Sequence, residues 1–281
     1  MSASSRPLLI VDGDSFAHRA YHGLPKSIRR AGNRGGGAIV GFANYLIRLY
    51  EAEQPRAVVV GWDTLAVPNW RALEFPPYQG GREFDDEIVE QLEVLPQFVA
   101  ACGFASGKAP GFEADDFLAT AVAMEEQRGG TALVASGDRD AFQLASAHTT
   151  ILHPVKAGEI ARIGPAEVRE RYGVEPGQVP DFIALRGDPS DKLPGARGVG
   201  AVTAASLLKR YADLEAALAD GKFPTQADDL RLYRRIATMV PDAPLAPIPD
   251  AAPTWNVAAE LARSWELKGL SERLAALAAA A

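Results

Sequence analysis

Three short runs of consecutive apolar residues recur in the first half of the chain, at positions 8–11, 57–60 and 131–135. Uninterrupted apolar runs of this length are typical of strands that are buried on both faces of a parallel sheet. Helical patterns separate them, at about 38–53, 84–102 and 113–128. The alternation of strand and helix predicts an α/β fold with a mostly parallel central sheet and helices on both faces.

The second half of the chain has a different pattern. Positions 149–152 and 160–163 bracket a glycine-containing turn and predict an antiparallel hairpin at the edge of the sheet. Beyond Pro165 the pattern is helical, with a proline-rich connector at 241–253 and alanine-rich helices after it. We therefore expect two parts, an α/β core over 6–164 and a helical region over 165–281. The last helices, with Trp255, Trp265 and Leu274, are expected to pack against the body.

Acidic residues cluster at the ends of the predicted strands and at the starts of predicted helices. Nine of them form five clusters, which are Asp12; Asp63; Glu113, Asp115 and Asp116; Asp138 and Asp140; and Asp188 and Asp191. Ligands of open α/β sheets bind beyond the carboxyl ends of the strands. Asp12, Asp63 and Asp138 all follow predicted strands, so we expect one shared site.

Carboxylates packed this densely repel one another and resist ionisation unless a strong positive charge lies among them. Oxygen ligands without a histidine or cysteine partner suit Mg²⁺ or Mn²⁺ rather than zinc. For Glu113, Asp115 and Asp116 there is a second interpretation, because acids at a helix N-terminus also stabilise the helix dipole. Three acids exceed what a cap requires, so metal ligation is favoured. The pattern predicts a divalent-metal site for phosphate chemistry.

A net charge of −7 would argue against binding to nucleic acid, but it is an average over the whole chain. Without the nine clustered acids, 27 of the 36 acidic residues remain against 29 basic ones, which leaves +2. Two stretches, 15–50 and 192–212, contain no acid at all. Solvated helix faces would explain either stretch alone, but together they suit a polyanion backbone held beside a metal centre. The expected DNA contacts are Arg19, Lys26, Arg34, Lys192, Arg197 and Lys209, with Gly198 and Gly200 allowing close backbone approach.

Cellular location can be judged from three features. The residues before position 7 are too polar for a signal peptide, and no apolar stretch approaches the length of a membrane span. The single cysteine, Cys102, lies in an apolar run, so an internal disulfide is excluded and a reducing compartment is indicated. We expect a cytoplasmic protein without a membrane partner.

At this point the motifs resemble those of the bacterial 5′-nuclease family (flap endonucleases and 5′-3′ exonucleases), including the amino-terminal domain of DNA polymerase I. The resemblance runs from about position 8 to 211. It lies in Asp12-Gly13-Asp14-Ser15, Trp62-Asp63, the segment 70–82, Gly111-Phe112-Glu113-Ala114-Asp115-Asp116, Ser136-Gly137-Asp138-Arg139-Asp140, Gly187-Asp188-Pro189-Ser190-Asp191 and the segment 194–208.

The resemblance implies a PIN-like nuclease core, a helical arch at about 70–102, and a helix-hairpin-helix-type DNA clamp at about 186–211. It implies a structure-selective nuclease that cuts DNA near junctions of single and double strands by two-metal catalysis. The expected cofactors are two or three Mg²⁺ or Mn²⁺ ions, and K⁺ at the clamp. The expected partners are 5′ flaps, nicked, gapped or overhanging duplexes and RNA-primed ends, in DNA replication and repair, and we expect a stand-alone monomer.

The chain departs from the family pattern in the arch segment. Gln79 stands where relatives commonly carry a lysine that engages the scissile phosphate, and a neutral amide cannot supply that charge. Tyr78, Arg71 and Arg82 match the family, and the two arginines are expected to compensate, with slower cutting or a stronger reliance on the metals. Lys192 replaces a common asparagine. The acidic run from Glu83 to Glu93 is interpreted as an outward helix face.

Two rival functions remain open from the residues alone. Asp12-Gly13-Asp14 after a strand also resembles the nucleophile motif of haloacid-dehalogenase-type phosphatases, with Ser136 in a supporting role. A catalytically weak DNA-junction-binding protein is the second, although buried acids without metal would be costly.

Overall fold

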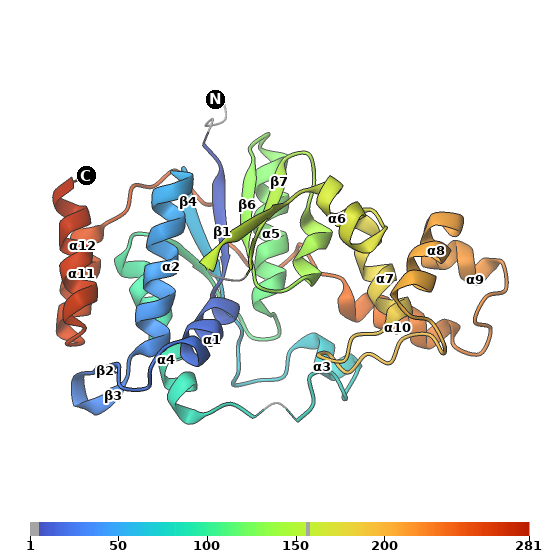
Figure 1. Cartoon of the computed structure of the whole chain (residues 1–281), viewed down its shortest axis with the longest axis horizontal. Helices are drawn as coiled ribbons and strands as arrows, with labels where there is room; N and C mark the ends of the chain where they lie inside the picture. The colour runs from blue at the N-terminus through green and yellow to red at the C-terminus, as the bar shows by residue number, and fades with distance from the viewer. Residues whose placement is uncertain (1–5, 82, 156–157, 281) are drawn as a thin grey trace.

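A six-stranded sheet forms the centre of the molecule (Figure 1). The structure, a computed structural model, describes residues 6–81, 83–155 and 158–280. The strand order is β5-β4-β1-β6-β7-β8, parallel at every pairing except the antiparallel β7–β8 edge hairpin. The strands are β1 (Leu8–Asp12), β4 (Ala57–Gly61), β5 (Ala105–Gly107), β6 (Ala132–Ala135), β7 (Thr149–Pro154) and β8 (Ile160–Ile163). The predicted α/β class and the predicted edge hairpin are confirmed.

The strands are buried on both faces because helices cover both sides of the sheet. Leu9 and Val11 of β1 pack on one side, and Leu8 and Ile10 pack on the other, as the two-residue period of a strand requires. The first side is covered by α1 (Gly13–Gly23), α2 (Gly37–Glu53) and α4 (Asp86–Ala101), and the second by α5 (Ala114–Gln127). This double cover explains why the strands read as continuous apolar runs.

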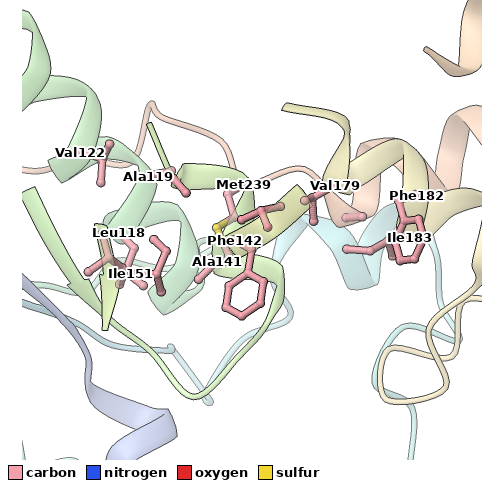
Figure 2. Packing of buried hydrophobic residues seen from close by; sticks show 14 of the residues in the cluster. Leu118, Ala119, Val122, Ala141, Phe142, Ile151, Val179, Phe182, Ile183 and Met239 are labelled. Carbon is pink, nitrogen blue, oxygen red and sulfur yellow. The ribbon is translucent and has the colours of Figure 1, made fainter. Parts of the chain in front are cut away.

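The helical region continues the core of the second side rather than forming a separate one. It contains α6 (Pro165–Tyr172), η4 (Pro176–Gln178), α7 (Val179–Arg186), α8 (Ala201–Tyr211), α9 (Leu214–Ala219) and α10 (Ala227–Ala237). Figure 2 shows Leu118 of α5, Phe142 of the short helix η2 (Asp140–Leu144) and Phe182 of α7 in one apolar cluster, with Met239 after α10. The helical region is thus packed firmly beside the carboxyl edge of the sheet.

The chain then returns to the opposite end of the molecule (Figure 1). The connector after α10 passes Arg56, whose buried side chain donates hydrogen bonds to the carbonyl of Ile248 and to Asp250. The last two helices, α11 (Trp255–Ser264) and α12 (Lys268–Ala280), pack against α4 and α2 with Trp255 and Trp265 buried. The expectation that these helices pack against the body is confirmed.

The apolar pattern did not predict several elements. They are the hairpin β2 (Arg29–Arg30) and β3 (Arg34–Gly35) around η1 (Ala31–Asn33), the helix α3 (Trp70–Glu74), and α1 and β5. The segment between α3 and α4, where we expected part of a helical arch, contains no helix in its described residues. None of the helices in the described part of the chain is both long and apolar enough to cross a membrane. The boundary at 164/165 stays a prediction.

Candidate metal centre

A cavity of about 330 Å³ opens at the carboxyl ends of β1, β4 and β6, and its wall is acidic. Six carboxylates line it, namely Asp12, Asp14, Asp63, Glu113, Asp115 and Asp138. Five of them belong to the nine acids identified in the sequence. The parallel strands deliver three of the five to the same edge, and the first turn of α5 delivers the other two. The structure therefore brings together acids up to 126 positions apart, from Asp12 to Asp138.

Hydrogen bonds hold the carboxylates in place. Asp12 caps α1, since its Oδ1 accepts from the backbone N–H of Ser15 at 3.0 Å, while its Oδ2 accepts from the buried hydroxyl of Ser136 at 2.7 Å. Asp63 accepts from the backbone N–H of Ala114 at 2.7 Å, which joins the end of β4 to the start of α5. The backbone N–H of Asp63 in turn donates to Asp14 at 2.8 Å. These bonds fix the acids before any ligand arrives.

The carboxylates in the cavity resist ionisation. Burial raises the pKa of Asp12 to about 7, with further increases from the charges of Asp63 and Asp138. Burial likewise raises the pKa of Glu113 to about 7, against the opposing charge of Arg71. The pKa values of Asp14 and Asp115 lie well above the ordinary aspartate value, mainly because of burial and then because of neighbouring carboxylates. A cation in the cavity would remove this penalty.

Hard oxygen donors and excess negative charge fit Mg²⁺ or Mn²⁺. Among the residues that the structure describes, no three acidic, histidine or cysteine side chains already form a ligand shell around one point. The fit therefore rests on donor chemistry and charge rather than on preformed coordination geometry.

Arg71 and Asp116 bind each other in the structure, instead of binding a phosphate and a metal ion as we expected. Arg71 of α3 is buried, and its guanidinium donates to Glu113 at 2.7 Å, to both oxygens of Asp116 at 2.7–2.9 Å, and to the carbonyls of Ile236 and Thr238. These bonds engage all five N–H groups, so in this structure Arg71 offers no donor to a phosphate and does not compensate for Gln79. Asp116 is fully buried and does not line the cavity, because its carboxylate neutralises Arg71.

Three further predicted ligands form a second group beside the cavity. Asp188 pairs with Arg186 at 3.1 Å and accepts from the backbone N–H of Ser190. The pKa of Asp140 lies well above the ordinary value because of burial, and then because of the charges of Asp138, Asp191 and Asp188. Asp138 lies in both groups, since it also lines the cavity. The two groups are thus electrostatically coupled.

The arch segment reaches the second group through Gln79. Its side-chain amide donates to the hydroxyl of Tyr78 at 2.9 Å and to Asp191 at 3.2 Å, and the Tyr78 hydroxyl donates to Glu113 at 3.1 Å. Gln79 has a φ of 50°, a conformation that is uncommon for residues other than glycine. Arg82, the other arginine expected to compensate, lies outside the described residues.

Sequence reasoning assigned no role at the metal site to four residues that lie at the cavity. Asp14 lines it, and the signal was its spacing of two from Asp12. Ser136 orients Asp12, and its place directly after β6 was the available signal. His18 and Phe84 also line the cavity, with ring centroids 5.1 Å apart. Nothing in the sequence pattern marks this aromatic pair, because it joins α1 to the segment before α4.

The first basic tract is largely neutralised by the acidic run that follows Arg82. Glu87 pairs with Arg29, and Glu90 pairs with Arg30 at 2.9 Å and with Arg34 at 3.3 Å. The ammonium group of Lys26 lies over the Tyr21 ring. The acidic run is thus partly an ion-paired surface against the β2–β3 hairpin rather than simply an outward face, and Arg34 is less available to DNA than we expected.

The second basic tract is more accessible. Lys192, Arg197 and Lys209 are exposed, and no ion pair with any of them is found among the described residues. Gly198 has a φ of 74°, a left-handed conformation that favours glycine, and Gly200 is the N-cap of α8. This geometry suits the expected clamp, which stays a prediction.

Fold and site together define an α/β protein with a cation-demanding acidic centre at the carboxyl edge of its sheet. The chain belongs to the 5′-3′ exonuclease family. Residues 7–173 match the family's N-terminal resolvase-like domain, and residues 174–260 match its C-terminal SAM fold. The resemblance identified from the motifs is confirmed.

Known relatives include polymerases that are much longer than this chain. DNA polymerase I of Mycobacterium tuberculosis is 38% identical over 255 residues, which cover 86% of this chain and 28% of the relative. The thermostable DNA polymerase I of Thermus thermophilus is 34% identical over 249 residues, which cover 85% and 29%. The chain thus spans less than a third of these relatives.

Solved structures share the fold at low sequence identity. The T5 D15 protein co-crystallised with metal ions has a TM-score of 0.68 at 17% identity, covering 97% of this chain and 100% of that one. The catalytic core of Rad2 in complex with DNA substrate has a TM-score of 0.60 at 14% identity, covering 96% and 93%. These likenesses confirm the predicted fold class.

Proposed function

We propose that this protein is a metal-dependent, structure-selective DNA nuclease, a 5′-flap endonuclease and 5′-3′ exonuclease that hydrolyses phosphodiesters near junctions of single and double strands. The observation that carries the proposal is the cavity in which Asp12, Asp63, Glu113, Asp115 and Asp138 meet at one edge of the sheet. Such a concentration of buried carboxylates is costly without cations, and cations at a carboxylate site serve phosphoryl chemistry.

The ligands would come from the cavity and from the group beside it. We assign Asp12, Asp14, Asp63, Glu113, Asp115 and Asp138 to the first set, and Asp140, Asp188 and Asp191 to the second. Because the carboxylates fall into two sets, the assignment provides for two Mg²⁺ or Mn²⁺ ions and leaves room for a third. When bound, these ions supply the positive charge that activates a water and neutralises the leaving 3′-oxygen.

Other side chains position the ligands. Arg71 and Tyr78 both bond Glu113, which restricts that carboxylate to one orientation. Ser136 and the first turn of α1 hold the two oxygens of Asp12 in different directions. Because these partners are buried, the carboxylates need little reorganisation when a cation and a phosphate enter.

The proposed substrates are 5′ flaps, nicked, gapped and overhanging duplexes and RNA-primed ends. The solved structure of a T5 flap endonuclease variant with DNA and metal ions, which shares the fold at a TM-score of 0.69 and 16% identity, supports DNA as the partner. The exposed Lys192, Arg197 and Lys209 would hold the duplex backbone beside Gly198 and Gly200. K⁺ at this clamp, a monomeric state and a cytoplasmic location belong to the same proposal.

The phosphatase alternative loses its support. Ser136, which that mechanism would turn toward a phosphate, is fully buried and donates to Asp12. The two family matches also cover the residues around Glu113 and Asp115 and the region from 174 to 260, which the phosphatase interpretation leaves unexplained.

Gel analysis of a 5′-labelled flap duplex with Mg²⁺ or Mn²⁺ tests the proposal. We expect short 5′ fragments from the wild type, no product in EDTA, and a loss of at least about a hundredfold in the Asp115→Ala and Asp138→Ala variants. A small aryl phosphate, assayed in parallel, should not be hydrolysed. Flap binding in Mg²⁺ without any cleavage would instead favour a DNA-junction-binding protein.

A further inference from the structure

A second cavity, of about 500 Å³, lies between α1 and α2 and is bordered by α12. Its polar lining differs sharply from that of the metal centre. Three arginines line it, Arg19 of α1, Arg48 of α2 and Arg273 of α12, and none of the described residues in its wall is acidic. We call this cavity the arginine pocket. Three cations around one hollow repel one another unless an anion lies among them.

The arginines are held in different ways. Arg273 donates to Asn44 at 2.7 Å and pairs with Glu51 at 3.1 Å, which anchors it to α2. Arg19 donates to the carbonyl of Val155 at 3.4 Å, a long and exposed bond. Among the described residues no carboxylate pairs with Arg19 or Arg48. By contrast, the β2–β3 arginines are ion-paired to α4, so within the pocket Arg19 and Arg48 are the arginines whose charge no carboxylate neutralises among the described residues.

Tyr45 provides an independent observation. Its ring lines the pocket and stacks on Phe16 at a centroid distance of 3.9 Å, and the Arg48 guanidinium lies 5.3 Å from the ring. Its hydroxyl is shielded from solvent and finds no hydrogen-bond partner in the part of the chain that the structure describes. A buried donor without a partner is rare and costly. A ligand oxygen would satisfy it.

The residues that line the pocket indicate which class of ligand fits it. Beside the arginines the pocket presents apolar surface from Phe16, Ala20 and Leu24. A bare inorganic anion would leave this surface in contact with water, whereas a nucleotide places its sugar or base there and its phosphate among the guanidinium groups. Guanidinium groups bind phosphate through paired N–H bonds.

We propose that the arginine pocket binds a phosphate-bearing nucleotide through Arg19, Arg48, Arg273 and the Tyr45 hydroxyl. The inference rests on the proposed function, since it gives the DNA a second anchor outside the metal centre. Both sites lie on α1, where Arg19 follows the cavity residue Asp14 by five positions, about 7 Å along the helix axis. Five positions also turn the helix by about 140°, so the arginine pocket and the metal centre lie on different sides of α1. The nucleotide comes either from the DNA strand or from a free 5′-mononucleotide.

Three variants of the full chain test the inference. Arg48→Gln removes an unpaired charge, Tyr45→Phe removes only the hydroxyl, and Arg29→Gln removes an equal charge at an ion pair outside the pocket. Binding of a labelled flap duplex is measured in EDTA over a range of salt concentrations. Arg48→Gln should weaken binding about tenfold and reduce the salt slope by about one, while Arg29→Gln should match the wild type.

Tyr45→Phe separates binding from structure. A structural role for the hydroxyl predicts a lower melting temperature, whereas our proposal predicts an equal or higher one together with binding about threefold weaker. Equal binding and equal salt slopes for Arg48→Gln and Arg29→Gln would overturn the inference. So would a Tyr45→Phe variant that binds like the wild type.

The source of the nucleotide is resolved with 5′-dAMP and inorganic phosphate. If 5′-dAMP raises the melting temperature of the wild type but not of Arg48→Gln, and displaces DNA, the free nucleotide is a ligand. If only DNA distinguishes the two proteins, the ligand is a phosphodiester in the strand. Binding is measured without cleavage, so the two proposals can fail separately. If Arg48→Gln weakens DNA binding but the wild type does not cut DNA, only the proposed function is wrong. If the wild type cuts DNA but Arg48→Gln binds it normally, only this inference is wrong.

Discussion

Arg71 and Glu113 form a buried ion pair, with 2.7 Å between Nη1 and Oε2, that ties α3, at the start of the arch segment, to the acidic cavity. Both side chains are less than a tenth exposed. The same guanidinium donates to the carbonyls of Ile236 and Thr238 at the end of α10. One residue therefore sets the orientation of a proposed metal ligand and joins the nuclease core to the helical region.

Replacing Arg71 tests that arrangement. Arg71→Ala should destabilise the protein by about 3–5 kcal/mol, because it leaves Glu113 and Asp116 buried without their cation. Arg71→Lys keeps the charge but cannot make the five bonds, so it should retain part of the stability and still lower the single-turnover cleavage rate. Urea unfolding and flap cleavage measure the two effects. An Arg71→Lys variant that cuts at the wild-type rate would show that the orientation of Glu113 is unimportant.

We expect the acidic cavity to destabilise the metal-free protein and to favour the binding of a metal ion. Burial and neighbouring charges hold the pKa of Asp115 well above its usual value, so the ionised side chain destabilises the metal-free fold. Asp115→Asn should stabilise the protein in EDTA at alkaline pH by about 1–2 kcal/mol and abolish part of the rise in melting temperature that Mg²⁺ produces. The exposed Asp242→Asn serves as the control and should change neither quantity. A destabilised Asp115→Asn protein would contradict this account.

The same electrostatics predicts the pH dependence. The pKa of Asp12 is about 7 in the folded protein and 3.8 as the reference value, so the folded state holds the proton more tightly. Its contribution to stability is fully present below pH 3.8 and is lost as pH rises toward 7. In EDTA the wild type should lose up to about 1.4 kcal/mol per pH unit in this window relative to Asp12→Asn. Urea unfolding at several pH values measures the difference, and a constant difference would refute the prediction.

Much of the fold could be predicted from short apolar runs, because the central strands are buried on both faces. The strands β1, β4 and β6 lie under helices on both faces, so each consists of apolar or small residues, apart from Asp12 at the end of β1, and is easy to recognise. Asp12, Asp63 and Asp138 were recognised as one site because each follows such a strand. The helix α1 was missed because it begins inside the acidic motif, where Asp12 caps it, and the role of Asp14 was missed with it.

What the sequence could not predict depends on contacts between distant segments. The ion pairs of Arg71 join α3 to α5, 42–45 positions away, and no local pattern encodes them. Likewise, the sequence predicts that the β2–β3 arginines bind DNA, whereas in the structure Glu87 and Glu90 of α4 form ion pairs with them. Net charge along a sequence therefore indicates a binding surface only after the partners of each charge are known.

Gln79→Lys tests the departure from the family pattern. The Gln79 amide lies between Tyr78 and Asp191, so an ammonium group there would stand beside the acidic groups and the substrate path. We expect the single-turnover cleavage rate to rise about tenfold or more, because a cation stabilises the charge that develops on the scissile phosphate better than an amide does. Gln79→Met, which removes the amide without adding charge, is the control. An unchanged rate for Gln79→Lys would mean that the metals supply all the charge that is needed.

Arg56 should be the main anchor of the connector that leads to α11. It pairs with buried Glu125 and donates to the Ile248 carbonyl at 2.9 Å and to Asp250 at 3.0 Å. Arg56→Met should cost about 3–5 kcal/mol in urea unfolding, because Glu125 is left buried and unpaired. Arg162→Met, which breaks the exposed pair with Glu53, should cost less than about 1 kcal/mol.

A double variant identifies the source of that cost. If the penalty arises from the orphaned charge, Arg56→Met combined with Glu125→Met should recover a large part of it, since two apolar side chains can replace a buried ion pair. If the penalty arises instead from the lost bonds to the connector, the double variant should stay as unstable as Arg56→Met. Limited proteolysis then discriminates further, because a connector released from the core exposes its backbone to cleavage between α10 and α11. Equal unfolding energies for Arg56→Met and Arg162→Met would rule out the anchor altogether.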